Sequence, residues 1–382
     1  MKNFNWKVLT LSLVMLTLLT GCWDYTEYEN MALVRTIGID MDKKGQILVT
    51  VETVGTPKQG NRGNKVGTVL QGKGKTVPEA IANLQTSLQA ELFLGYLIAV
   101  IINEEAAKKQ MKNIMDYLFI TPDIRESVFM VISKEKPGDI LGRPASLTDQ
   151  LVGEAIQDFF MVTARTGASF PVRLKEFNKM LLREGVEAVV PLIKTADRGR
   201  FKLSGMVVFR GYKPIGVLDG MESRGWGRIT NKELLGRISV SVTLPDRKPP
   251  VLTAFKLEGN KSKIKVKTGG KLPQLYISTR VTATVDQIGD SSGFITPEIL
   301  HACETALQAE IKKELTAAIK KAQKLQSDIF GIGPKFYQQH RREWNVAYKK
   351  KWNDVFAEAP VHYDVHIKIL NSGIMVFPFR EQ

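Results

Sequence analysis

The sequence predicts a mixed α/β or α+β protein with several domains, built from mixed sheets with flanking helices. Three observations predict it. Apolar strand-like runs alternate with helical periods over the first half of the chain, and residues 234–285 are rich in strand-forming residues. Residues 297–356 then carry helical periodicity, which predicts a long helix pair followed by strands that complete a sheet.

The first half opens with two predicted strands, residues 31–40 and 47–54, joined by turn residues. The run Gly72-Lys73-Gly74-Lys75-Thr76 is similar to a phosphate-binding loop. However, neither register places a Gly five residues before a Gly-Lys-Ser/Thr triplet. Thr76 followed by Glu79 instead predicts a capping box that opens a helix. A nucleotide site is therefore not predicted here.

Buried strands are predicted at residues 96–102 and 128–132, with Asn103 capping the helix between them. Two more helices follow, near residues 147–160 and 171–183. The strand at 187–194 contains Pro191, which predicts an edge strand because proline lacks the N–H that a central strand donates. The alternation of strands and helices predicts a mixed α/β sheet.

The polar break at residues 195–199 predicts a domain boundary. We therefore expect a signal segment at 1–21, an N-terminal mixed α/β domain at 22–197 and a C-terminal α+β region at 198–382. In one interpretation the last region divides into subdomains at 198–250 and 251–382.

The C-terminal region begins with a predicted hairpin at residues 203–218 and a Gly-rich patch at 220–227. Strict alternation places Lys263, Lys265 and Lys267 together on an exposed strand face. The helix predicted at 297–325 carries one apolar stripe, and Cys303 lies on it, so we expect this cysteine to be a small buried apolar residue rather than a nucleophile.

A second helix is predicted to bear six aromatic side chains, each four residues from the next. Steps of four advance by about 40° on an α-helix, so this series should spiral and touch more than one neighbour. We interpret it as core rather than as a ligand site. The residues are Phe336, His340, Trp344, Tyr348, Trp352 and Phe356. Strands at 361–369 and 374–377 are predicted to finish the sheet.

The N-terminus has the order of a bacterial export signal: Lys2 and Lys7, an apolar run over residues 8–19, then Leu19-Thr20-Gly21-Cys22. Twelve helical residues reach about 18 Å at roughly 1.5 Å each, whereas a bilayer core is about 30 Å thick. The last four residues resemble a lipobox. Cleavage is then expected between Gly21 and Cys22, with Cys22 becoming an S-diacylglycerol cysteine that is also open to N-acylation by a chain such as palmitate. The alternative is an ordinary secretory signal cut after Gly21.

Composition is that of a globular protein, with 43% hydrophobic and 24% charged residues. Without the two lysines of the signal, 52 basic residues face 39 acidic ones, a net charge of +13. Since export removes contact with nucleic acid, we expect an anionic membrane surface or an acidic partner, with a solvated basic surface as the alternative.

Chemical motifs are scarce. His362, Asp364 and His366 share the exposed face of the strand at 361–369, but their spacing indicates neither a further ligand nor an open coordination position. The sequence lacks a Gly-x-Ser-x-Gly elbow, a His-Glu-x-x-His helix and a Cys-His pair. We therefore predict no enzyme, no catalytic residue, no metal site and no cofactor.

Motifs at both ends resemble one family. Gly21-Cys22-Trp23-Asp24, with Ile37-Gly38-Ile39-Asp40 after it, is similar to the start of Ger(x)C lipoproteins, the C subunits of spore germinant receptors. Residues 328–333 (Asp-Ile-Phe-Gly-Ile-Gly), together with Trp344 and Trp352, resemble that family's C-terminal signature. Tyr96 departs from the pattern, because the family often has His after the Gly at position 95.

This resemblance implies a non-catalytic lipoprotein subunit, with a three-domain mixed α/β body, of a nutrient receptor in the inner membrane of a bacterial endospore. It implies attachment to membrane lipid through Cys22 on the outer face, and A-type and B-type receptor subunits as partners, with no nucleic acid.

Two alternatives remain at this point. An extracytoplasmic solute-binding lipoprotein serving a transporter would gain thermal stability from a bound amino acid or sugar. An envelope enzyme acting on cell-wall polymer would show turnover. The sequence alone does not say which nutrient is sensed.

Overall fold

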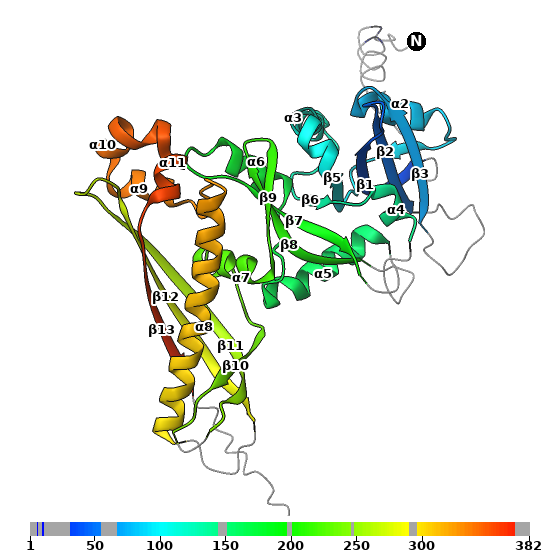
Figure 1. Cartoon of the computed structure of the whole chain (residues 1–382). Helices are drawn as coiled ribbons and strands as arrows, with labels where there is room; N and C mark the ends of the chain where they lie inside the picture. Colours follow the sequence, from blue (N-terminus) through cyan, green and yellow to red (C-terminus); the bar gives the residue numbers. More distant parts are fainter. Residues whose placement is uncertain are drawn as a thin grey trace, which may run out of the picture.

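The computed structural model of the chain describes residues 31–54, 67–143, 151–196, 201–245, 248–289 and 296–370, together with Trp6 and Thr10. Within these ranges the strands form one nine-stranded sheet and one four-stranded sheet, each flanked by helices (Figure 1). The predicted mixed α+β class is therefore confirmed. The predicted segment at 374–377 lies outside the described residues.

The first sheet has the strand order β3-β2-β1-β5-β6-β7-β8-β9, with β4 beside β1. Its central strands β1, β5, β6 and β7 run parallel to one another. On either side, the pairs β1–β2, β2–β3, β7–β8 and β8–β9 are antiparallel. The strands are β1 (Met31–Met41), β2 (Ile47–Val54), β3 (Thr68–Gly74), β4 (Glu91–Phe93), β5 (Ala99–Asn103), β6 (Phe129–Ser133), β7 (Val189–Thr195), β8 (Phe201–Arg210) and β9 (Lys213–Leu218).

Helices cover both faces of the parallel part of this sheet. Val100 and Ile102 of β5 face one buried cluster, and Ala99 and Ile101 face another. Burial on both faces explains why this strand is a continuous apolar run instead of an alternating one. The helices are α2 (Val77–Gln85), α3 (Glu104–Ile120), α4 (Pro137–Leu141), α5 (Val152–Thr166) and α6 (Leu174–Leu182).

The prediction that Pro191 marks an edge strand is wrong. β7 lies between β6 and β8. β6 pairs with β7 only at Leu192 and Ile193, and the register between β7 and β8 shifts between Pro191 and Ile193. A bulge is the other place in a sheet where proline fits, because no ladder hydrogen bond is required of it there.

The hairpin β8–β9 follows the predicted boundary at residues 197/198 in sequence, yet it extends the first sheet. One buried apolar cluster also continues from this sheet into the second. The division of the chain into domains stays a prediction.

The Gly-rich patch is a helix, α7 (Gly220–Ile229), which the sequence did not reveal. A capping box starts it: Asp219 accepts from the Glu222 backbone N–H, and Glu222 accepts from the Asp219 N–H, both at 2.8 Å. Glycine is needed inside this helix because a Cβ on Gly225 would overlap the Glu314 carbonyl oxygen of the helix packed against it.

The second sheet has the order β10-β11-β12-β13 and is covered on one face by the long helix α8 (Pro297–Lys324), which lies along it in Figure 1. The predicted apolar stripe is confirmed, since Cys303, Leu307, Ile311 and Leu315 are buried. The strands are β10 (Arg237–Val242), β11 (Val251–Lys267), β12 (Gln274–Ile288) and β13 (Val361–Ile369).

The second helix of the predicted pair is not continuous. It consists of α9 (Ile332–Gln339), α10 (Arg341–Glu343), a π-helical turn (Trp344–Tyr348), a 3₁₀ turn (Lys349–Lys351) and α11 (Trp352–Glu358). The breaks change the direction of the aromatic series. It therefore gathers into one cluster and does not spiral around a straight axis.

Candidate functional site

The predicted cleavage site between Gly21 and Cys22 and the predicted lipid attachment at Cys22 lie outside the described residues, so the structure does not place them. Among the helices that are described, none is long and apolar enough to cross a membrane. The residues of the C-terminal signature, in contrast, are described, and they lie together in the folded chain.

The signature segment 328–333 centres on the carboxylate of Asp328, a residue that is 0% exposed to solvent. Its Oδ1 accepts from the Phe330 N–H at 3.0 Å. Its Oδ2 accepts from the Gly333 N–H at 2.7 Å and from the Trp352 indole N–H at 3.0 Å. The carboxylate thus holds the turn before α9 against the first residue of α11.

Burial raises the pKa of the Asp328 carboxyl, and the N–H groups that donate to it oppose that shift. Because this carboxylate is enclosed and its acceptors are occupied, the group has no face open to a substrate. Its geometry is that of a structural tie.

Aromatic rings pack around this tie. Phe336 contacts the rings of Trp344, Tyr348 and Trp352 at centroid distances of 5.8, 5.0 and 5.6 Å. Trp344 and Trp352 are each 2% exposed. The interpretation of the aromatic series as core is confirmed.

The same segment is fastened to the first sheet by the residues before β7. The Glu187 N–H donates to the Asp328 carbonyl oxygen at 2.7 Å. A Cβ on Gly333 would stand 2.6 Å from the Gly185 oxygen, so the two backbones touch where both glycines lie. Trp226 of α7 adds a hydrogen bond from its indole N–H to the Ile329 oxygen, at 2.8 Å.

Glu187 also joins the ends of two other elements. Its Oε2 accepts from the Gly211 N–H in the β8–β9 turn at 2.9 Å, and its Oε1 accepts from the Asn353 amide of α11 at 3.2 Å. We call residues 185–187, Trp226, 328–333, Trp344 and Trp352 the signature junction. It fixes the two sheets and the C-terminal helices relative to one another.

A second buried ionic cluster was missed by sequence reasoning. The Glu314 carboxylate of α8 accepts from Arg224 Nε at 2.5 Å and from Arg228 Nε at 2.6 Å, both on α7. Arg228 and Glu314 are each 0% exposed, and both Nη atoms of Arg228 lack a hydrogen-bond partner. Charged residues in a Gly-rich patch gave no signal that they would be buried.

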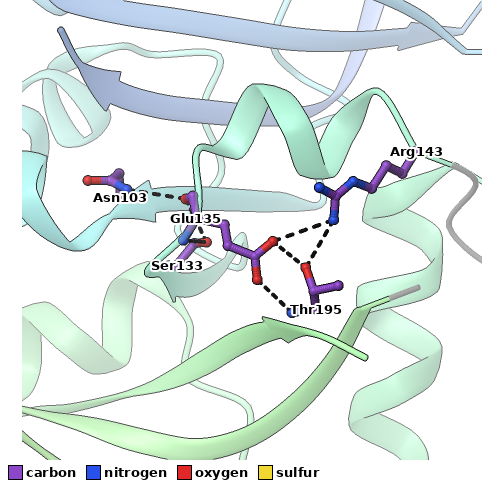
Figure 2. A network of polar contacts seen from close by, with 5 residues as sticks. All are labelled: Asn103, Ser133, Glu135, Arg143 and Thr195. Carbon is purple, nitrogen blue, oxygen red and sulfur yellow. Dashed lines mark hydrogen bonds and ion pairs between the residues drawn. The ribbon is translucent and has the colours of Figure 1, made fainter. Parts of the chain in front are cut away.

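The carboxyl ends of parallel strands are where open α/β sheets usually bind ligands. Figure 2 shows that the polar groups at this edge hydrogen-bond to one another, with the Glu135 and Arg143 side chains 35% and 41% exposed. The Glu135 carboxylate accepts from the Thr195 N–H at 2.8 Å, from the Thr195 hydroxyl and from Arg143 at 3.5 Å. Asn103 and Ser133 hydrogen-bond to the Glu135 carbonyl oxygen at 3.2 and 2.8 Å. The Thr195 hydroxyl is the main reason that the pKa of Glu135 is lowered.

The run that is similar to a phosphate-binding loop lies among the described residues. Residues 72–74 belong to β3 and not to a phosphate loop, and Gly72 packs directly on α2. The Thr76 hydroxyl accepts from the Glu79 N–H at 3.3 Å as predicted, but Glu79 accepts from the Lys75 N–H and not from that of Thr76. Only half of the predicted capping box is therefore formed.

Cys303 is buried as predicted, and burial raises the pKa of its thiol to about 11. His362, Asp364 and His366 lie on the exposed face of β13, where His366 Nε2 is 2.9 Å from Asp364 Oδ1. In the described part of the chain, no group of three or more His, Cys, Asp or Glu side chains is arranged to hold a metal ion.

Surface depressions lie elsewhere. A cavity of about 440 Å³ runs beside α6 and another of about 340 Å³ lies between the start of α2 and α3. Lys175, Lys179 and Arg183 line the first, and Val77, Tyr117 and Ile120 are among those that line the second. Neither is lined by residues of the signature junction or of the carboxyl edge of the sheet.

Both halves of the chain match a known class of protein. The model of the spore germination protein N-terminal domain matches residues 24–195, and that of the spore germination B3/GerAC-like C-terminal domain matches residues 204–373. The chain belongs to the Ger(x)C family of spore germination proteins, and the resemblance inferred from its two ends is confirmed.

Two named relatives match nearly end to end. Spore germination protein KC of Bacillus subtilis (strain 168) is 21% identical over 97% of this chain and 97% of its own length. Spore germination protein B3 of the same organism is 22% identical over 94% and 96%. The crystal structure of the GerBC protein matches with a TM-score of 0.53 at 18% identity, over 88% of this chain and 97% of that one, which supports the fold.

Proposed function

We propose that this protein is a non-catalytic lipoprotein subunit of a spore nutrient germinant receptor, required for nutrient-triggered germination. The observation that carries the proposal is the match of both family models, which together span residues 24–195 and 204–373. The signature junction supports the non-catalytic part, because its polar groups are occupied by one another and it has the character of a rigid scaffold.

Cys22 attaches the protein to the outer face of the inner spore membrane in this proposal. The support is the order of the N-terminal sequence, with two lysines, an apolar run and then Leu19-Thr20-Gly21-Cys22. Stable anchoring requires two acyl chains or one chain with a basic patch, and a diacylglyceryl group supplies two chains. A-type and B-type receptor subunits in the same membrane are its partners.

The test is the variant Cys22→Ala, expressed in spores that lack the native gene. We expect it to leave the membrane fraction and to reduce the germination response to nutrient. Cys303→Ala is the matched control, since it removes the other cysteine of the chain and leaves the attachment residue intact. Mass spectrometry of the membrane-bound control protein should reveal a diacylglyceryl-modified amino terminus. Full membrane retention and a normal response of Cys22→Ala would contradict the proposal.

A further inference from the structure

The outer face of the second sheet carries a concentrated positive charge. α8 covers the inner face, and the outward side chains of β11, β12 and β13 are left to solvent. Where residues 261–267 of β11, 274–282 of β12 and 361–368 of β13 lie side by side, six outward residues are cations and one is an acid, Asp364. The cations are Lys261, Lys263, Lys265, Lys267, Arg280 and Lys368. We call this set the basic sheet face.

The strand register places these side chains in adjacent rows. Lys261 lies opposite Arg280, which lies opposite His366. Lys265 lies opposite Tyr276, which lies opposite His362. Like charges directly opposite on neighbouring strands destabilise a sheet. An anionic partner would relieve the repulsion between Lys261 and Arg280.

The six cations are without carboxylate partners among the described residues. None takes part in a recorded ion pair, and Lys267 instead lies 4.5 Å from the centre of the Tyr276 ring. Asp364, the acid of this face, is already engaged with His366. The net charge of the face is +5, a third of the +15 of the whole chain.

The other end of the same sheet is neutralised. There Arg237 pairs with Asp286 across the strands, and Lys256 pairs with Glu258 at 2.8 Å. The excess positive charge of the outer face is therefore concentrated at one end of the sheet.

We propose that the basic sheet face is a docking surface for anionic lipid headgroups, a proposal that rests on the membrane location given above. Five of its six cations are lysines, which are compact point charges suited to a mobile array of phosphates, whereas fixed carboxylates on a protein favour the planar fork of arginine. Three neighbouring strands also present these charges side by side, so they can approach a flat bilayer together.

Docking would add a second membrane contact to the lipid anchor and would set the orientation of the protein. A lysine at an anionic surface contributes about 1 kcal/mol, which is roughly fivefold in the ratio of docked to undocked protein. The attraction falls off within a Debye length of about 8 Å at physiological salt, so the contact should be sensitive to ionic strength.

The test uses the full lipidated chain in vesicles of phosphatidylcholine, with and without a third of phosphatidylglycerol. A fluorophore is placed on the face through Thr282→Cys, and a quencher is carried by the lipid. Cys303 is buried, with its thiol pKa raised to about 11, so the introduced cysteine is the reactive one among the described residues. We expect quenching only in the anionic vesicles, with its loss in concentrated salt.

The variant that replaces Lys261, Lys263, Lys265 and Lys267 by Gln should lose most of this quenching, at roughly fivefold in the docking ratio for each lysine. A control variant that replaces four exposed lysines on β-turn and α3 surfaces should keep it, although it loses the same charge. The control positions are Lys43, Lys44, Lys109 and Lys112. The loss of quenching in concentrated salt, measured on the chain that keeps all four lysines, tests the proposal without a substitution at these positions.

Three results would overturn the proposal. If the protein floats with the vesicles but its label is never quenched, the docking surface fails and the anchor stands. If it does not float, the anchor fails, and the docking surface falls with it. If the lipid does not quench the fluorophore, and the fluorophore is shielded from solvent only when the other receptor subunits are added, the partner is an acidic protein surface and not lipid.

Discussion

Replacing Asp328 by Asn tests the signature junction at its centre. The variant keeps the size of the side chain but removes its charge and turns one acceptor into a donor. If the amide oxygen keeps the Gly333 and Trp352 N–H groups, the amide nitrogen faces the N–H of Phe330. In the wild-type protein the Phe330 nitrogen lies 3.0 Å from Asp328 Oδ1, the oxygen that the amide nitrogen would replace.

The expected cost follows from burial. A buried N–H without an acceptor costs about 1–3 kcal/mol, and hydrogen bonds to a charged group contribute about 1.5–3 kcal/mol. Allowing for partial relaxation, we expect a loss of about 2–4 kcal/mol in the free energy of unfolding. At roughly 2–4 °C per kcal/mol the melting temperature should fall by about 5–15 °C.

The assay is thermal unfolding followed by near-ultraviolet circular dichroism, which also reports the packing of Trp344 and Trp352. Asp354→Asn is the matched control, because Asp354 is an exposed aspartate on α11. Exposed substitutions usually change stability by less than about 0.5 kcal/mol. If Asp328→Asn and Asp354→Asn melt together, with unchanged aromatic signals, the carboxylate does not hold the junction and the reasoning is refuted.

Three further predictions concern other buried or engaged groups. Glu314→Gln should lower the free energy of unfolding by about 3–5 kcal/mol, because Arg228 then stays buried without a counter-charge. The control Glu310→Gln, which removes one partner of a surface ion pair, should change the free energy of unfolding by less than about 0.5 kcal/mol. Equal midpoints of the two variants in urea unfolding would contradict this. Cys303, with a thiol pKa of about 11, should react with a thiol reagent only after denaturation, and rapid labelling of the folded chain would show that it is accessible. The pKa of Glu135 is lowered in the folded state, so the ionised carboxylate stabilises the fold by about 1 kcal/mol or less at this partly exposed site. This stabilisation is present above the ordinary pKa of 4.5 and is lost as the pH falls through the folded-state pKa. The difference in stability between wild type and Glu135→Gln should therefore disappear in acid, and a difference that persists there would refute the assignment.

Local elements were predictable because their signals act between near neighbours. The strands at 31–41 and 47–54, the Asn103 cap, the β8–β9 hairpin and the stripe of α8 each depend on residues a few positions apart. The family resemblance was also visible, since its motifs are short and lie near the two ends of the chain, at residues 21–40 and 328–352.

Contacts between distant residues could not be predicted in the same way. Arg228 and Glu314 are 86 positions apart, and Asn353 and Glu187 are 166 apart. No periodicity marks such pairs, so an Arg in a Gly-rich patch gave no sign of complete burial. The interior position of Pro191 was hidden for the same reason, because the register of a neighbouring strand created the bulge that accommodates it.

The sequence by itself predicted the fold class and the family, which are confirmed, because these depend on composition and on short patterns. The export signal with Cys22 comes from the same kind of short pattern and stays a prediction. Tertiary structure alone decided that the signature residues meet at one buried carboxylate and that the lysines of β11 join those of neighbouring strands on one face. The physical reason is that burial, pairing and surface charge are properties of what packs beside a residue, and the chain order does not record them.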